Sequence, residues 1–234
     1  MVEQYYGGAV CLLDATNSTI TITDSKFMDN RAQYGDGPVS FLKGGGAVYL
    51  FNATNSTITI TDSEFMNNSA QGFGGAVYVL LFSSSNTIIT VNASNFNNNK
   101  AHQDGAAVSL EYLFISSPPV HSIILIIFSN FTNNTAENGG VVSVEYTYHV
   151  IIAESVFQNN SAYQYGGVLK LLDTKVEITS SCFTDNVANT GGVIWTYQST
   201  LAVNQTTFAK NTACLLYTSP SPRDATLSRM PSSA

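Results

Sequence analysis

Charged side chains are scarce in this sequence. Only 11% of the 234 residues are Asp, Glu, Lys or Arg, whereas about 25% is usual for a soluble domain. The polar positions are filled mainly by Asn, Ser and Thr, and there are 17 Gly. Exposed helix faces draw on Glu, Lys and Arg. The composition therefore disfavours helices and favours a β-rich chain with a nearly neutral exterior.

Basic clusters and long apolar segments are also missing. The net charge is −7, and without a basic patch to neutralise phosphates we expect no binding to nucleic acid. The longest purely apolar run, residues 123–128, is far shorter than the ~20 residues of a membrane-spanning helix. Residues 1–6 lack the basic-then-apolar order of a signal peptide. We expect them to be a short lead-in, with the true start of the protein further upstream.

A repeat fills most of the remaining chain. The motif Phe-x-x-Asn-x-Ala occurs seven times, with successive Phe residues 38, 31, 35, 26, 26 and 25 positions apart. A second motif, Gly-Gly-(Ala/Val)-(Val/Leu/Ile), alternates with it from Gly7 onward, with Ala106 replacing the second Gly in the fourth copy. The repeated Phe/Asn pairs are Phe27/Asn30, Phe65/Asn68, Phe96/Asn99, Phe131/Asn134, Phe157/Asn160, Phe183/Asn186 and Phe208/Asn211.

The pattern within each repeat is typical of β-strands. Residues 57–61 alternate Thr and Ile, as a half-buried strand does. In the Gly-Gly segment the fourth and sixth positions are almost always aliphatic, which directs them inward and the fifth position outward. The fifth positions vary freely and are Cys11, Tyr49, Tyr78, Ser109, Ser143, Lys170 and Trp195. Each repeat thus predicts three short strands, such as residues 47–50, 57–61 and 64–66.

Stacking explains how such short repeats form a core. One coil cannot bury its apolar face alone, but stacked coils bury a continuous column. We expect the seven Phe rings to form an aromatic ladder in that column. The Asn side chains are expected at the following turn, with hydrogen bonds to the coils above and below. The sequence therefore predicts an all-β, single-stranded parallel β-helix of about seven coils over residues 7–213.

The cysteines are expected to remain unpaired. Cys11 and Cys182 fall in the first and sixth repeats, which places them roughly 24 Å apart at ~4.8 Å per coil. A disulfide needs Cα atoms within about 7 Å. The cysteines therefore do not indicate a compartment.

The alternation of Gly-Gly-Ala-(Ile/Val) with Phe-x-x-Asn resembles the repeats of chlamydial polymorphic outer-membrane proteins. These belong to the wider class of pectate-lyase-like, right-handed parallel β-helices. The resemblance covers residues 7–213 and all seven Phe-x-x-Asn motifs. It implies a right-handed coil and a surface-displayed passenger with a role in adhesion.

Residues 214–234 differ abruptly in composition from the repeats. Residues 214–224 and 228–234 resemble the two ends of a translated sequencing adapter, separated by an index-sized gap. The resemblance implies that this tail is non-native and disordered and that the natural protein continues beyond Ala213.

No group of residues predicts a catalytic, metal or cofactor site. The carboxylates scatter among the repeats, whereas lyases on this fold need clustered acidic ligands with a base, and hydrolases need two or three neighbouring carboxylates. Asp24 and Asp62 occupy equivalent positions directly after a strand, where Asp commonly makes a turn. His102, His121 and His149 lie in different repeats at non-equivalent positions, so they do not predict a metal site.

Two weaker signals concern glycans. Tyr49 and Tyr78 occupy neighbouring outward positions. Their rings could stack on sugars, but we favour the interpretation that they stabilise the pairing of the two strands. Nine Asn-x-Ser/Thr sequons matter only if the protein is eukaryotic and secreted. They begin at Asn17, Asn52, Asn55, Asn67, Asn92, Asn130, Asn133, Asn159 and Asn204.

The uninterrupted repeat and the weakly charged exterior favour a non-enzymatic β-helix at the cell surface or outside the cell. Its role would be adhesive or structural, with a host or neighbouring cell-surface protein or glycan as the partner. The alternative is part of a pectate-lyase-like carbohydrate-active enzyme or a glycan-binding protein. Under both interpretations we expect no binding to nucleic acid and no membrane-spanning segment in this sequence.

Overall fold

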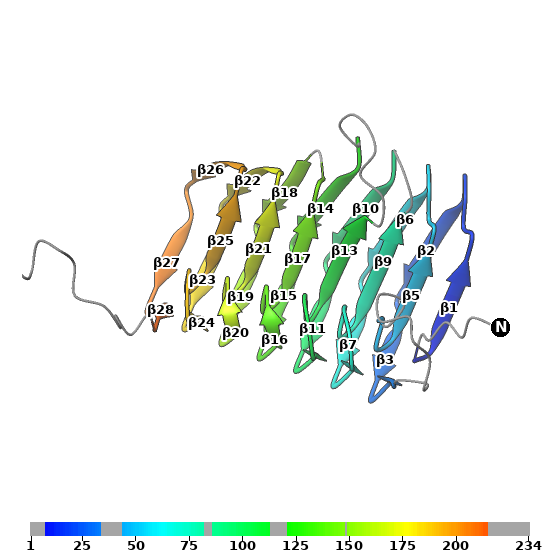
Figure 1. The fold of residues 1–234 in the computed structure, drawn as a ribbon, viewed down its shortest axis with the longest axis horizontal. Helices are drawn as coiled ribbons and strands as arrows, with labels where there is room; N and C mark the ends of the chain where they lie inside the picture. Colours follow the sequence, from blue (N-terminus) through cyan, green and yellow to red (C-terminus); the bar gives the residue numbers. More distant parts are fainter. Residues whose placement is uncertain (1–7, 34–43, 82–85, 113–120, 148, 215–234) are drawn as a thin grey trace, which may run out of the picture.

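Four parallel sheets wrap around one core in the computed structural model, which describes residues 8–33, 44–81, 86–112, 121–147 and 149–214. Each sheet has seven strands, and each coil of the chain contributes one strand to every sheet (Figure 1). The predicted lead-in at residues 1–6 and the predicted tail, apart from Cys214, lie outside the described residues.

The strands of the first sheet are β1 (Val10–Leu13), β5 (Val48–Phe51), β9 (Val77–Leu81), β13 (Val108–Tyr112), β17 (Val142–Glu145), β21 (Leu169–Leu172) and β25 (Ile194–Tyr197). Those of the second are β2 (Thr19–Thr23), β6 (Thr57–Thr61), β10 (Ile88–Asn92), β14 (Ile123–Ile127), β18 (His149–Ala153), β22 (Lys175–Thr179) and β26 (Thr200–Asn204).

The strands of the third sheet are β3 (Lys26–Met28), β7 (Glu64–Met66), β11 (Asn95–Asn97), β15 (Asn130–Thr132), β19 (Val156–Gln158), β23 (Cys182–Thr184) and β27 (Thr207–Ala209). Those of the fourth are β4 (Arg31–Ala32), β8 (Ser69–Ala70), β12 (Lys100–Ala101), β16 (Thr135–Asn138), β20 (Ser161–Tyr165), β24 (Val187–Ala188) and β28 (Thr212–Ala213).

The predicted all-β parallel solenoid of about seven coils is confirmed. Equivalent repeat positions lie side by side in neighbouring coils, as Ile58 does with Ile89 and Phe65 with Phe96. The sequence predicted three strands per coil, and the structure adds a fourth that contains the invariant Ala of the repeat. Within the described ranges no helix is long and apolar enough to cross a membrane. The right-handed sense of the coil stays a prediction.

The Phe side chains form the predicted aromatic ladder. Rings of adjacent coils are stacked, from 4.6 Å between the centroids of Phe65 and Phe96 to 5.0 Å between those of Phe96 and Phe131. The ladder runs through all six coil-to-coil steps from Phe27 to Phe208. In coils 2 to 6 the rings are fully buried among inward-facing Val, Leu and Ile side chains.

The repeat asparagines form a second ladder of stacked amides. The Asn99 amide Nδ2 donates to Phe65 O at 2.9 Å and to Asn134 Oδ1 at 3.1 Å. Its Oδ1 accepts from the backbone N and the Nδ2 of Asn68, at 3.1 and 3.0 Å. An Asn side chain has two donor hydrogens and two acceptor lone pairs, so all four are used. The predicted hydrogen bonds to the coils above and below are confirmed.

The asparagines lie at the predicted turn, between the third and fourth strands of each coil, but their burial was not predicted. Asn160 has no exposed surface, although an Asn at a turn is ordinarily in contact with water. Its Nδ2 donates to Phe131 O at 2.9 Å and to Asn186 Oδ1 at 3.1 Å. Because these bonds replace those to water, Asn160 can be a core residue. The fully or almost fully buried members of the ladder are Asn68, Asn99, Asn134, Asn160 and Asn186.

A serine ladder, which the sequence analysis missed, runs two residues before each Phe. The backbone N–H of Ser63 donates to Ser94 Oγ at 3.1 Å, and that of Ser94 donates to Ser129 Oγ at 3.2 Å. The same hydroxyl donates back to a carbonyl two residues earlier, as Ser94 Oγ does to Asn92 O. The structural motif is therefore Ser-x-Phe-x-x-Asn-x-Ala, with Thr206 in place of Ser in the last coil.

Left-handed backbone turns the chain between sheets. Gly45 begins the corner before the first sheet with a φ of +72°, a conformation that Gly adopts without steric cost. At the next residue, Gly46, an added Cβ would lie 1.9 Å from Gly75 O, so this position needs Gly because the neighbouring coil is too close. Asp24 and Asp62 have φ values of +48° and +49°, which confirms the prediction that they are turn residues.

The terminal coils differ from the interior ones in exposure. Phe208 in the last coil is 44% exposed, whereas Phe183 one coil earlier is fully buried. Cys214, assigned by sequence to the tail, donates its backbone N–H to Ala188 O at 2.9 Å. Cys11 and Cys182 are not joined by a disulfide, as their separation predicted.

Replacing one asparagine of the buried ladder should destabilise the whole solenoid. Asn134→Ala leaves Phe96 O and the donors of Asn99 without their partner in a buried layer. We expect a loss of roughly 2–3 kcal/mol in the free energy of unfolding, because each unsatisfied buried polar group costs roughly 1–3 kcal/mol. The exposed Asn189→Ala is the control, and urea denaturation followed by circular dichroism is the measurement. Equal midpoints for the two variants would contradict the role of the ladder.

Candidate functional site

The fifth positions of the Gly-Gly segments share one register on the first sheet, as predicted. Tyr49 pairs with Cys11 and Tyr78, and Lys170 pairs with Ser143 and Trp195. None of these residues belongs to the main core cluster. The row therefore lies on the outer side of the sheet.

Tyr49 and Tyr78 lie on that outer side, but they are not available to a sugar. Their rings are stacked, with centroids 5.3 Å apart and planes 7° from parallel. Both side chains are fully buried, in a small cluster with Leu80 that Phe51 and Phe73 also contact. The expectation that these rings could stack on a glycan is therefore wrong. The alternation of the strand gave their direction correctly but did not reveal that they are covered, and their stacking fits the strand-pair interpretation.

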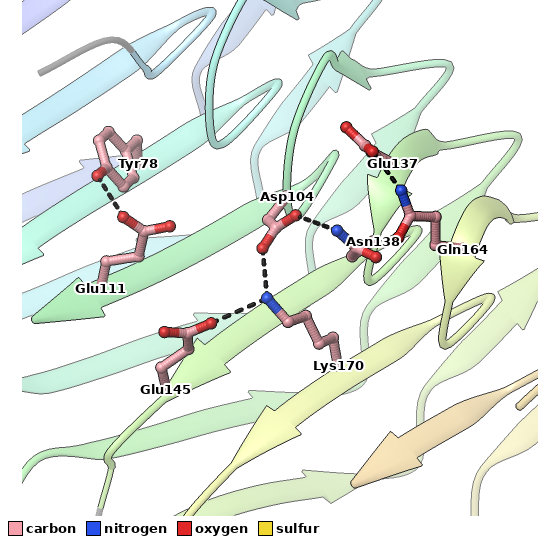
Figure 2. A network of polar contacts seen from close by, with 8 residues as sticks. All are labelled: Tyr78, Asp104, Glu111, Glu137, Asn138, Glu145, Gln164 and Lys170. Carbon is pink, nitrogen blue, oxygen red and sulfur yellow. Dashed lines mark hydrogen bonds and ion pairs between the residues drawn. The ribbon is translucent and has the colours of Figure 1, made fainter. Parts of the chain in front are cut away.

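Polar side chains from several coils meet further along the same outer face (Figure 2). The Lys170 ammonium on β21 donates to Asp104 Oδ2 at 2.6 Å and to Glu145 Oε1 on β17 at 2.9 Å. Asp104 Oδ1 also accepts from Asn138 Nδ2 at 2.8 Å. The exposed fractions of the three charged side chains are 15% for Lys170, 9% for Asp104 and 27% for Glu145. We call Asp104, Glu145 and Lys170 the ion-pair cluster.

The ion-pair cluster keeps its lysine charged. Burial alone would lower the pKa of Lys170, but the Asp104 and Glu145 carboxylates outweigh it and raise the pKa above the usual value. A lysine held in this way is a poor proton acceptor at neutral pH. Because the ammonium joins residues that are 66 and 25 positions away in sequence, the cluster ties successive coils together.

A second polar pair lies beside the cluster. Tyr78 OH donates to Glu111 Oε2 on β13 at 2.9 Å. Burial is the main cause that raises the pKa of Glu111 to about 8, with a further contribution from the carboxylates of Glu145 and Asp104 and a counteracting hydrogen bond from Tyr78. Burial also raises the pKa of Tyr78 well above its usual value. Both groups are therefore neutral at pH 7.

This convergence was not predicted, because the carboxylates are scattered among the repeats in the sequence. Glu111 and Glu145 each stand two residues after an outward Ser, so strand alternation alone could have placed them on the outer face beside Lys170. Asp104 gives no such signal because it lies at a corner outside the strands. In the part of the chain that the structure describes, no three His, Cys, Asp or Glu side chains are arranged to hold a metal ion.

The histidines do not converge. His149 lies on β18 with its Nε2 3.4 Å from Glu177 Oε1, whereas His102 lies at the corner after β12 and His121 precedes β14. The sequence correctly placed them in separate repeats.

The sequons are mostly on the surface. Asn159 is exposed although the next residue, Asn160, is buried in the asparagine ladder. Asn52 and Asn92 are half-buried. The exposed sequon residues are Asn17, Asn55, Asn67, Asn130, Asn133, Asn159 and Asn204. Their use stays a prediction.

The outer face of the second sheet has a different character. None of the outward residues on its first four strands, β2, β6, β10 and β14, is charged. These outward residues are Thr19, Thr21, Thr23, Thr57, Thr59, Thr61, Ile88, Thr90, Asn92, Ile123, Leu125 and Ile127. We call this surface the charge-free face. Strand β18, whose outward residues are His149, Ile151 and Ala153, separates this face from the charged Lys175 and Glu177 on β22. At the corners directly after β2 and β6, Asp24 and Asp62 border the face.

An exposed aromatic residue borders the charge-free face. Phe128 follows β14 and is 57% exposed. Its φ is +50°, in the left-handed region that costs a non-glycine residue about 1–2 kcal/mol. The equivalent corners carry Asp24, Asp62, Ala93, Glu154, Ser180 and Gln205. The corner therefore imposes a positive φ in every coil. Phe128, in the fourth coil, is the one aromatic residue among these corners.

Comparison with known proteins supports the repeat itself. Residues 62–80 match the family model of the Chlamydia polymorphic membrane protein repeat. The matched segment contains Phe65, Asn68 and the Gly74-Gly75 pair, so the predicted resemblance is confirmed for this copy. No curated protein and no solved structure matches the chain.

Glu111 should make stability depend on pH. Its pKa is raised in the folded chain to about 8 from 4.5, so folding favours the protonated form. Stability should therefore fall as pH rises from about 4.5 to 8 and then level off. Glu111→Gln keeps a neutral group beside Tyr78 and should melt higher than the wild type at pH 9, with the two proteins converging at pH 4.5. Thermal melting across this range is the measurement, and parallel curves would rule out this role.

Removing the lysine of the ion-pair cluster should be costly. Lys170→Met leaves Asp104 and Glu145 as neighbouring carboxylates without their ammonium, and we expect a loss of about 3 kcal/mol, as for other pairs that lose one buried partner. The matched control is Lys26→Met in the pair Lys26–Glu64, whose side chains are 65% and 38% exposed. Surface pairs contribute up to about 1 kcal/mol. Equal denaturation midpoints for the two variants would contradict a structural role for the cluster.

Proposed function

We propose that the chain is a surface-exposed or secreted β-solenoid with an adhesive role, and that the charge-free face is its contact surface. The observation that carries the proposal is the uncharged outer surface of β2, β6, β10 and β14 together with the exposed ring of Phe128. The match to the polymorphic membrane protein repeat supports a location at the cell surface.

The chemistry of the charge-free face suits contact with another macromolecule. The centres of protein interfaces are depleted of charged residues and enriched in aromatic ones. In the direction of the solenoid axis, Thr59, Thr90, Leu125 and Ile151 follow one another in register, so apolar side chains adjoin hydroxyls on a regular strand surface. Such a surface offers both desolvated contact and hydrogen bonds without charges that would have to be neutralised.

The backbone at Phe128 adds a second argument. A bulky residue at positive φ is uncommon, and Asn or Asp at this corner would cost less. Strained backbone is frequent at functional sites, and Phe128 is the one member of this row of corners that combines the strain with a large exposed ring. Retaining Phe there is therefore better explained by binding than by folding.

Phe128→Asn separates adhesion from stability because the two should move in opposite directions. Asn tolerates the left-handed conformation of this corner, so the free energy of unfolding of the variant should rise by up to about 1 kcal/mol. Beads coated with the variant should detach from cultured cell monolayers at clearly lower shear than beads coated with the wild type. The control is Gln205→Asn, which introduces the same residue at the equivalent corner of the last coil without removing a ring and should leave adhesion unchanged.

A second variant tests the centre of the face. Leu125→Lys places one charge among the uncharged rows and should weaken bead attachment without unfolding the chain, since Leu125 faces outward. Attachment equal to the wild type in both Phe128→Asn and Leu125→Lys would refute the charge-free face as the contact surface.

A further inference from the structure

A shallow pocket lies on the outer side of the fourth sheet, away from the charge-free face. Its volume is about 240 Å³, below the roughly 300–1,000 Å³ of sites for drug-sized ligands. It is therefore matched to a ligand of about one ring. The pocket is lined by Lys100, Ala101, His102, Thr135, Ala136, Glu137 and Tyr163.

The pocket arises from a difference in corner length between three coils. Three residues separate the repeat Ala from the next Gly in coil 3 (residues 102–104) and in coil 5 (residues 163–165), but only two, Glu137 and Asn138, do so in coil 4. The pairing of β16 with β20 accordingly shifts between Ala136 and Asn138. Gln103 O accepts the backbone N–H of both Glu137 and Asn138, at 2.7 and 3.3 Å. The short corner of coil 4 leaves a hollow between its longer neighbours.

The bulge in β20 presents an aromatic ring to this hollow. Two residues of β20, Tyr163 and Gln164, stand opposite Glu137 alone. Extra residues of this kind re-aim side chains and are frequent beside functional sites. Tyr163 is 75% exposed, so its ring lies largely in solvent, in contrast to the covered rings of Tyr49 and Tyr78.

The remaining walls combine a small apolar floor with hydrogen-bonding groups. Ala101 and Ala136 are buried and pack in one small cluster with Ala106. Glu137 is oriented by Gln164, whose Nε2 donates to its Oε1 (Figure 2). The lining thus provides an aromatic face, a fixed carboxylate acceptor and an ammonium donor, with one charge of each sign.

We propose that this pocket binds one neutral hexopyranose unit of a glycan. The C–H face of a pyranose is weakly positive and suits the negative face of the Tyr163 ring, and ring hydroxyls can donate to Glu137 and accept from Lys100. The balanced charge of the lining favours a neutral sugar over a uronic acid. The inference rests on the proposed adhesive function only for its biological use, because the pocket and the charge-free face lie on different sheets.

The test is saturation-transfer NMR and calorimetry on the full chain with methyl glycosides of glucose, galactose and mannose as probes. We expect at least one of them to bind and Tyr163→Ala to weaken it about tenfold or more. Because Tyr163 is exposed, this variant should keep the wild-type melting temperature. The matched control is Tyr197→Ala, which removes another exposed tyrosine outside the pocket and should bind as the wild type does.

A second variant tests the origin of the pocket. Insertion of one Gln after Glu137 gives coil 4 the corner length of its neighbours and should abolish sugar binding although Tyr163 is retained. Absence of binding by all three glycosides, equal binding by Tyr163→Ala, or tighter binding of methyl glucuronide would overturn the proposal. None of these results affects the bead attachment of Phe128→Asn, so the pocket and the adhesive face succeed or fail separately.

Discussion

The buried asparagine amide, repeated once per coil, is the interaction on which the rest of the structure depends. Its four hydrogen bonds are complete only when an identical amide lies in the coil above and another in the coil below, as around Asn99. This requirement fixes the axial spacing and the register of the coils. The Phe stack, the serine ladder and the parallel pairing of all four sheets follow from the same register, because each of them also needs equivalent residues at equal heights.

The sequence predicted the parts of the fold that repeat. Phe-x-x-Asn and Gly-Gly recur in every coil, so their ladders and corners could be inferred from periodicity. The serine ladder was missed because Ser is common throughout the chain and its spacing from Phe was not considered. The burial of Asn160, Tyr49 and Tyr78 could not be predicted, since the sequence pattern gives the direction of a side chain but not what lies over it. The pocket beside Tyr163 depends on a difference of one residue between corners, which is visible in the sequence only after the coils are aligned.

Inward and outward positions of this solenoid are therefore under different constraints. Inward residues must match the coils on both sides, and they vary little. Outward residues meet no such requirement, and the three outer surfaces discussed above differ completely: an ion-pair cluster on the first sheet, an uncharged Thr and Ile surface on the second, and a hollow with an exposed Tyr on the fourth. Differences in binding between proteins of this architecture are expected to lie in outward residues and corner lengths, while the core stays the same.

The asparagine ladder also has a direction. The amide-to-amide hydrogen bonds all run the same way: each Nδ2 donates one hydrogen to the Oδ1 of the next coil, from Asn30 to Asn68 and onward to Asn186 and Asn211. The amide dipoles therefore add along the axis instead of cancelling, with their positive ends toward the last coil. The solenoid is electrically polar, and its two ends are chemically unlike even though their coils have the same cross-section. A group with lone pairs suits the last coil, and a hydrogen-bond donor suits the first.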